Sequence, residues 1–130
     1  MKLRPMTMQD AGKMLEWKNY PETRKFAITS HGKISKKNHM AWLPKNIRYF
    51  KVLDWEGIAV GAVRVQNREI SIWIDRAVWG FGIATEVIKR ISKKGYRAKI
   101  VEGNVGSMRA FIKAGYLPKE FKDDYYVFTN

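Results

Sequence analysis

The chain of 130 residues contains no cysteine. It therefore has no disulfide framework, no thiol nucleophile and no thiolate ligand for a metal. Long hydrophobic runs are also absent, because stretches such as residues 72–74 are far too short to cross a bilayer. Residues 1–5 form no apolar segment of the kind that a secretory signal needs. We therefore expect a cytoplasmic protein that does not enter a membrane.

Acidic residues are few, since 12 Asp and Glu stand against 25 Lys and Arg and the formal net charge is +13. Such a chain attracts polyanions, which include nucleic acid, an anionic membrane and small ligands with several phosphates. The charge alone does not choose among them. Hydrophobic residues make up 45% of the chain, which is enough for the core of a single domain spanning residues 1–130.

Hydrophobic periodicity and turn residues predict an α/β domain with the order β-α-α-β-β-β-α-β-α-β-β. The first helix begins at Thr7, the second ends before Pro44, and Gly95 closes the third as a left-handed cap. Residues 21–34 are expected to be irregular, with a helical turn around 23–27. The expected strands span 3–6, 48–53, 58–65, 70–74, 97–102, 116–121 and 125–128, and the expected helices span 7–18, 35–43, 84–94 and 105–114.

Small residues cluster between the strand at 70–74 and the helix that follows it. Gly80, Gly82 and Ala84 allow a backbone to approach a bulky ligand, and the free N–H groups of a first helical turn favour phosphate. In isolation the same pattern fits a plain strand-to-helix turn equally well. A Walker A loop is excluded because Gly-Lys-Ser/Thr is missing, and the glycine spacing argues against a Rossmann fingerprint.

Two segments resemble the GCN5-related N-acetyltransferase (GNAT) superfamily. Residues 79–84 resemble its acetyl-CoA-binding motif, Gln/Arg-x-x-Gly-x-Gly/Ala, with Gly82 and Ala84 matching and Trp79 in place of Gln or Arg. Residues 104–107 and 113–116 resemble the family's Asn-x-x-Ser/Ala and Lys-x-Gly-Phe/Tyr segments. The resemblance implies a mixed, mostly antiparallel central sheet of about six or seven strands, flanked by about four helices.

The same resemblance implies where acetyl-CoA binds. The pantetheine arm would enter between the strands ending at Ile74 and Glu102, and the first turn of the next helix would take the pyrophosphate. Arg76 and the surface of Lys89 and Lys93 are candidates for the 3′-phosphate. The implied cofactor-binding residues are Ile74, Arg76, Trp79, Gly80, Phe81, Gly82, Ile83, Ala84, Thr85, Asn104 and Ser107.

Residues 3–7, 16–19, 24 and 39–43 are similar to the branch of the superfamily that contains ribosomal-protein Nα-acetyltransferases and amino-sugar acetyltransferases. Within that branch, the similarity is greatest to the pseudaminic-acid pathway enzyme, which implies a UDP-linked 4-amino-dideoxy sugar as acceptor. The residues expected at the acceptor are Trp17, Asn19, Arg24, His39, Trp42 and Phe111.

Catalytic groups are less clear from the sequence. His39 is the first choice as general base because imidazole titrates near neutral pH, although packing or substrate binding would also explain it. Asp75 and Glu102 could act through water, and Asp75 also suits a turn. The family's usual acid is a tyrosine seven residues after the motif asparagine, and that position is Phe111. Tyr116, Tyr125, Tyr126 or solvent would then supply the proton. No acidic or histidine cluster has metal-ligand spacing, so no metal is expected.

The sequence thus predicts an acetyl-CoA-dependent N-acetyltransferase that acts on a nucleotide-linked amino sugar. An Nα-acetyltransferase of the ribosomal-protein type is the alternative within the class. A nucleic-acid-binding module or an inactive CoA-binding domain is the alternative outside it, and nucleic acid is the less expected partner because no known binding motif is present. A homodimer is also expected.

Overall fold

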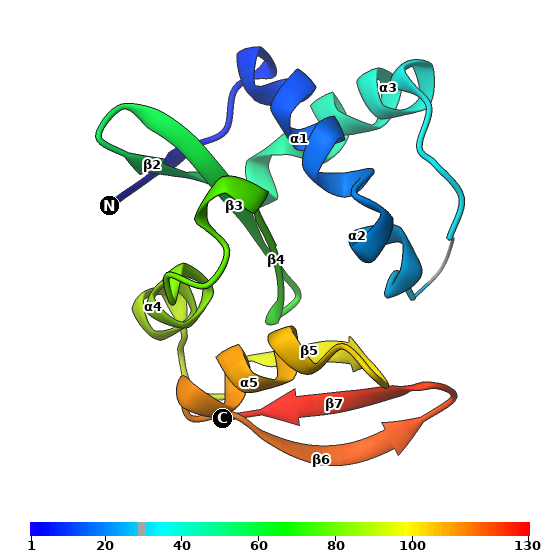
Figure 1. The fold of residues 1–130 in the computed structure, drawn as a ribbon, viewed down its shortest axis with the longest axis vertical. Coiled ribbons are helices and arrows are strands. Elements are labelled where there is room, and N and C mark those ends of the chain that lie inside the picture. Colours follow the sequence, from blue (N-terminus) through cyan, green and yellow to red (C-terminus); the bar gives the residue numbers. More distant parts are fainter. Residues whose placement is uncertain (29–30) are drawn as a thin grey trace.

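The computed structural model describes residues 1–28 and 31–130, and in this part of the chain seven strands form one sheet. The order across the sheet is β1-β2-β3-β4-β5-β7-β6, and only the β4–β5 pair is parallel (Figure 1). The expected mixed, mostly antiparallel sheet is therefore confirmed. The strands are β1 (Lys2–Pro5), β2 (Phe50–Trp55), β3 (Ile58–Gln66), β4 (Glu69–Ile74), β5 (Arg97–Val101), β6 (Leu117–Lys122) and β7 (Tyr125–Thr129).

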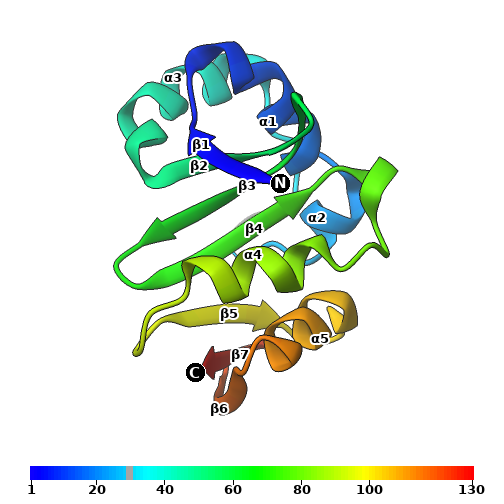
Figure 2. The same cartoon turned by 90° about the vertical axis from the view of Figure 1, so that its left-hand side faces the viewer.

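Helices cover both faces of the sheet. In Figure 1 the first three helices lie on the opposite side of β3 and β4 from α4, and in Figure 2 α4 runs across β4 and β5. Side chains alternate along β2, so Phe50 and Val52 pack in the core under α1 and α3, whereas Leu53 packs in the core with α4 and α5. The helices are α1 (Ala11–Lys18), α2 (Pro21–Lys25), α3 (Lys36–Asn46), α4 (Ile83–Ile91) and α5 (Val105–Lys113), with 3₁₀ turns η1 (Met8–Asp10), η2 (Ile47–Tyr49) and η3 (Arg76–Val78).

Side chains cap the first helical segment, α3 and α5 at their starts, as expected at Thr7. The backbone N–H of Thr7 donates to Asp10 at 2.9 Å, Ser35 accepts from the Asn38 N–H at 3.1 Å, and Asn104 accepts from the Ser107 N–H at 3.4 Å. The α2 helix begins two residues before the expected turn at 23–27, because Pro21 occupies its first position, where the missing N–H costs nothing. Residues 29–30 of the segment expected to be irregular lie outside the described residues.

Two expected helix ends are wrong. α3 continues through Pro44 to Asn46. Pro44 has no N–H to donate to the Met40 carbonyl, and the helix tolerates this because both residues lie on its exposed face. α4 ends at Ile91 rather than at Gly95. The Ser92 hydroxyl there donates to the Ile88 carbonyl at 2.5 Å, and Gly95 (φ +89°) serves the turn that leads into β5.

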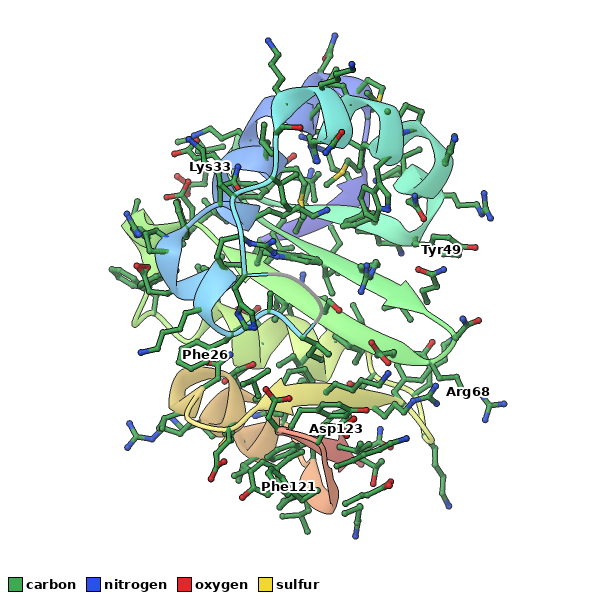
Figure 3. All side chains as sticks on the ribbon, turned by 90° about the vertical axis from the view of Figure 1, so that its right-hand side faces the viewer. Phe26, Lys33, Tyr49, Arg68, Phe121 and Asp123 are labelled. Carbon is green, nitrogen blue, oxygen red and sulfur yellow. The ribbon has the colours of Figure 1, made fainter. Side chains whose placement is uncertain are left out.

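The sheet opens between β4 and β5. Only Glu69 and Arg97 are paired in register, and the Arg97 N–H donates to the Arg68 carbonyl at 2.8 Å. β5 is hydrogen-bonded to β7 on its other side, and β7 forms a hairpin with β6. Figure 3 shows this hairpin, which carries Phe121 and Asp123, well separated from Tyr49. The strand ends at Ile74 and Val101 therefore diverge and leave an opening in the sheet. No helix among the described residues has the length and hydrophobicity needed to span a bilayer.

Candidate active site

A cavity of about 570 Å³ lies at the opening between β4 and β5. The strand that lines it is β4, with α2 on one side and the start of α4 and α5 on the other. Phe26, which follows α2, lies toward α5, and a Cβ built at Gly103 would be 3.6 Å from its ring (Figure 3). The expected cofactor residues that line this cavity are Ile74, Trp79, Gly80, Gly82, Ile83, Ala84, Thr85, Asn104 and Ser107.

The loop before α4 is built by two glycines in left-handed conformations. Gly80 has φ +87° and Gly82, the N-cap of α4, has φ +75°. Side chains rarely adopt this conformation, and no atom lies within 4 Å of a Cβ built at either position. The first turn of α4 is thus left open toward the cavity, and its N–H groups together with the helix dipole favour an anion.

Phe81 and Arg76, both expected at the cofactor, do not line the cavity. The ring of Phe81 is 68% exposed and packs on Trp55, with centroids 6.2 Å apart. Arg76 forms an ion pair with Glu22 at 2.8 Å and lies 4.3 Å from the centroid of the Tyr20 ring. Glu22 of α2 and Tyr20, which precedes α2, therefore hold Arg76 in its position beside the cavity.

Trp79 packs against the end of β4. Its indole N–H donates to the Ile74 carbonyl at 2.8 Å, and its ring meets Tyr20 edge-on at 5.9 Å. The Arg76 N–H donates to the Tyr20 hydroxyl at 3.3 Å. The Ile74 carbonyl and the Arg76 N–H, which lie where the pantetheine arm is expected to enter, thus have partners within the chain. Their role toward the cofactor stays a prediction.

The sequence missed a basic pair on α5. Arg109 and Lys113 lie one turn apart, both exposed, and both line the cavity. The expected phosphate partners Lys89 and Lys93 do not line it. The four-residue spacing of Arg109 and Lys113, on the helix that Asn104 caps, is the sequence signal that would have predicted this pair. Thr23 and Phe26 of the α2 region also line the cavity and were not expected there.

Asp75 and Trp17 are joined at the end of β4. The Trp17 indole N–H donates to Asp75 Oδ2 at 3.0 Å, and the Ala77 N–H donates to Oδ1 at 2.9 Å. Burial acts to raise the pKa of Asp75, but these two donors and the Lys13 ammonium outweigh it, so the pKa lies below its usual value. Trp17 is fully buried, so its ring packs in the core while its N–H fixes this carboxylate.

His39 is buried between α3 and α1. Its Nε2 lies 3.0 Å from the Ala11 carbonyl, so this nitrogen carries a proton and donates. Burial lowers the pKa of His39, and the Lys18 charge adds to this, against the opposing effect of the Ala11 carbonyl. The residue lies outside the large cavity and lines a second one of about 220 Å³.

Neither Phe111, expected at the acceptor, nor the tyrosines expected to supply the proton line the cavity. Phe111 is buried in the core against Tyr116, with centroids 5.1 Å apart, and the Tyr116 hydroxyl lies 2.6 Å from Ser92 Oγ. Tyr126 packs against Phe121, Tyr125 lies beneath the Lys99 ammonium, and neither lines the cavity. Glu102 is exposed at the end of β5.

The remaining acceptor candidates surround α2 and the second cavity. Asn19 exchanges two hydrogen bonds with the Ile34 backbone, at 2.8 and 2.9 Å, and thus fixes the chain before α3. Arg24 donates to the Lys18 carbonyl at 2.9 Å, and Trp42 lines the second cavity. Within the described residues, no group of three or more His, Cys, Asp and Glu side chains could hold a metal ion.

Comparison with known families matches residues 1–117 to a model described as an acetyltransferase (GNAT) domain. Among curated proteins no match is found. Solved structures share the fold across 98% of this chain. They include spermidine N-acetyltransferase from Vibrio cholerae with CoA and spermine (15% identity, 91% of that chain, TM-score 0.78), the Salmonella typhimurium protein yncA with its cofactor acetyl-CoA (18%, 90%, 0.73) and ribosomal-protein-alanine N-acetyltransferase from Brucella melitensis (19%, 96%, 0.71).

Proposed function

Because the chain belongs to the acetyltransferase (GNAT) family, we propose that it transfers the acetyl group of acetyl-CoA to a primary amine. One observation supports this above the others: the cavity between β4 and β5 opens directly beside the N-terminus of α4. A strand edge without a partner suits an extended arm, and a helix N-terminus suits a diphosphate. The structural relatives with CoA or acetyl-CoA bound support the same proposal.

The residues present fit acetyl-CoA. Gly80 and Gly82 leave the first turn of α4 free of side chains, so its N–H groups would hold the pyrophosphate. Arg109 and Lys113 would bind a further phosphate from the α5 side, since both are cations that line the cavity. Asn104 and Ser107 line the cavity at the start of α5 and would contact the cofactor there.

When bound, acetyl-CoA supplies a thioester that a neutral amine attacks directly; the new C–N bond forms as the C–S bond breaks. A backbone N–H of β4 would stabilise the negative charge on the thioester oxygen. Of the three expected bases, Glu102 has an exposed carboxylate, both oxygens of Asp75 have partners, and His39 is buried outside the large cavity. We therefore propose Glu102, acting through water, as the first of these to test.

The acceptor proposed first is an amino sugar linked to a nucleotide, as the sequence predicts, and a protein N-terminus is the alternative. The excess of positive charge supports an anionic acceptor of the first kind. Two of the structural relatives named above are a spermidine and a ribosomal-protein-alanine N-acetyltransferase, so the shared fold does not choose between acceptor classes. The expected homodimer and cytoplasmic location stay predictions.

Isothermal titration with acetyl-CoA and with free CoA tests the proposal, and a thiol-release assay then compares UDP-amino sugars with N-terminal peptides. We expect saturable one-to-one binding, followed by thiol release with one acceptor class. Binding without release from any amine would favour an inactive CoA-binding domain. Absence of binding would overturn the proposal. Nucleic acid would then be the next partner to test, by measuring how DNA or RNA binding depends on salt concentration.

A further inference from the structure

Lys18, at the last position of α1, is a buried cation without an acidic partner among the described residues. Only 8% of the residue is exposed, and its ammonium lies 3.7 Å from the centroid of the Trp42 ring. Phe50 and Trp73 complete an aromatic cage at 5.9 and 6.0 Å. An ammonium removed from water is costly unless it is paired, and aromatic faces offset only part of that cost.

The charged groups that shift the pKa of Lys18 are also positive. Burial first, and then the Arg64 and Arg24 guanidinium groups, lower the pKa of Lys18 to about 8. Arg64 Nε is itself buried with no hydrogen-bond partner within the described residues, and the only bond given by this guanidinium there is from Nη2 to Ser71 at 3.0 Å. Lys18 and Arg64 therefore repel one another, and the Glu69 charge, which acts to raise the pKa of Arg64, does not overcome the effect of burial on that group.

A cavity of about 220 Å³ adjoins this cluster, lined by Lys18 together with Asn38, His39 and Trp42. His39 is only 1% exposed, and because its Nε2 donates to Ala11, its Nδ1 retains a lone pair that has no partner within the described residues. A buried polar atom of this kind is rare in a finished protein interior. A hydrogen-bond donor on a ligand would satisfy it.

Trp73 connects the Lys18 cage to the large cavity. It lines the large cavity, and its ring centroid lies 6.0 Å from the Lys18 ammonium. An acceptor bound beside Trp73 would therefore lie close to Lys18.

We propose that the cavity beside Lys18 binds an oxyanion group of the acceptor, a carboxylate or a phosphate, with a hydroxyl or N–H next to it for His39. The assignment to the acceptor rests on the proposed function. An acceptor of this class is an amine that carries negative charge. A polyamine would meet three cations of the same sign at Lys18, Arg64 and Arg24.

Binding of the oxyanion is tested on the free protein, without acetyl-CoA. Indole N–H resonances are followed by NMR during titration with acetate, inorganic phosphate or methylammonium, at ionic strength held constant with chloride. We expect saturable shifts with one of the two oxyanions and none with methylammonium, and the stronger oxyanion identifies the group. Shifts that fail to saturate, or that chloride alone reproduces, would overturn the proposal.

Lys18→Met keeps an unbranched apolar stem in the aromatic cage and removes the charge. We expect it to fold, because it deletes a buried cation, and to bind the oxyanion at least tenfold more weakly. Lys45→Met makes the same exchange at an exposed position of α3 and should bind like the wild type. If the Lys18 variant does not fold, Arg64→Met takes its place. Equal affinity in the folded variant and the control would contradict the proposal.

A second measurement uses matched amines with acetyl-CoA. We expect kcat/KM at least tenfold higher for aminoethyl phosphate than for ethanolamine, or for glycine than for glycinamide, in the wild type and in Lys45→Met but not in Lys18→Met. No preference for the charged amine would overturn the assignment to the acceptor. If the protein binds the oxyanion but does not bind CoA, the proposed function is refuted, whereas the oxyanion site beside Lys18 is not.

Discussion

Asp75 illustrates how one side chain can organise the end of a strand. It follows β4, accepts from Trp17 and from the Ala77 N–H, and begins η3. Both oxygens are therefore engaged in holding the fold beside the cavity. A carboxylate used in this way contributes to stability through hydrogen bonds, and its ionised form is the one that they stabilise.

Asp75→Asn should lower the free energy of unfolding by about 1 kcal/mol at neutral pH, because one charged acceptor is lost. The pKa of Asp75 lies below its usual 3.8, so its contribution is present above pH 3.8 and is lost as the pH falls through the folded value. Urea denaturation should therefore show a difference from the wild type that narrows in acid.

The control for this variant is Asp123→Asn, which changes an exposed carboxylate in the β6–β7 turn. We expect kcat of Asp75→Asn to stay within tenfold of the wild type once both are folded. A loss of a hundredfold or more, with a changed pH profile, would instead make Asp75 the general base.

At the scale of elements, the loop before α4 depends on a left-handed N-cap. Gly82→Ala should cost about 1–2 kcal/mol from backbone strain. It should also weaken CoA binding at least tenfold, because the new methyl group would occupy the space proposed for the diphosphate. Thermal unfolding and isothermal titration measure the two effects separately.

Gly57→Ala is the matched control, since Gly57 has φ +83° and no atom within 4 Å of a built Cβ, but lies in the β2–β3 hairpin. It should show the same strain with unchanged CoA affinity. Equal CoA affinity in both variants would mean that the loop at 80–82 does not meet the cofactor.

For the whole molecule, the net charge of +13 determines the response to salt. Salt screens repulsion among the exposed cations, so raising NaCl from low to physiological concentration should raise Tm by roughly 2–4 °C, or about 1 kcal/mol. The same salt should weaken the binding of CoA, which is itself polyanionic.

Replacing Lys89 and Lys93 together by Glu lowers the net charge away from the cavity. This variant should show a smaller rise of Tm with salt and an unchanged salt dependence of CoA binding. A Tm independent of salt in the wild type would show that the exposed charges are already balanced locally.

The sequence by itself predicted the family and most elements correctly, because the signals are local. Alternation along β2–β4, the caps at Thr7 and Asn104 and the small residues at 80–84 each depend on neighbours in the chain. The error at Pro44 has a tertiary cause, since the sequence could not show that this side of α3 faces water.

Only the tertiary structure decided how side chains distant in sequence meet. Trp17 and Asp75 are 58 positions apart, and neither reveals the hydrogen bond that joins them. The cage around Lys18 draws its rings from α3, β2 and β4, so Lys18 was not a candidate before the fold was known. Burial and pairing depend on contacts between elements, and those contacts arise only when the sheet and its helices pack together.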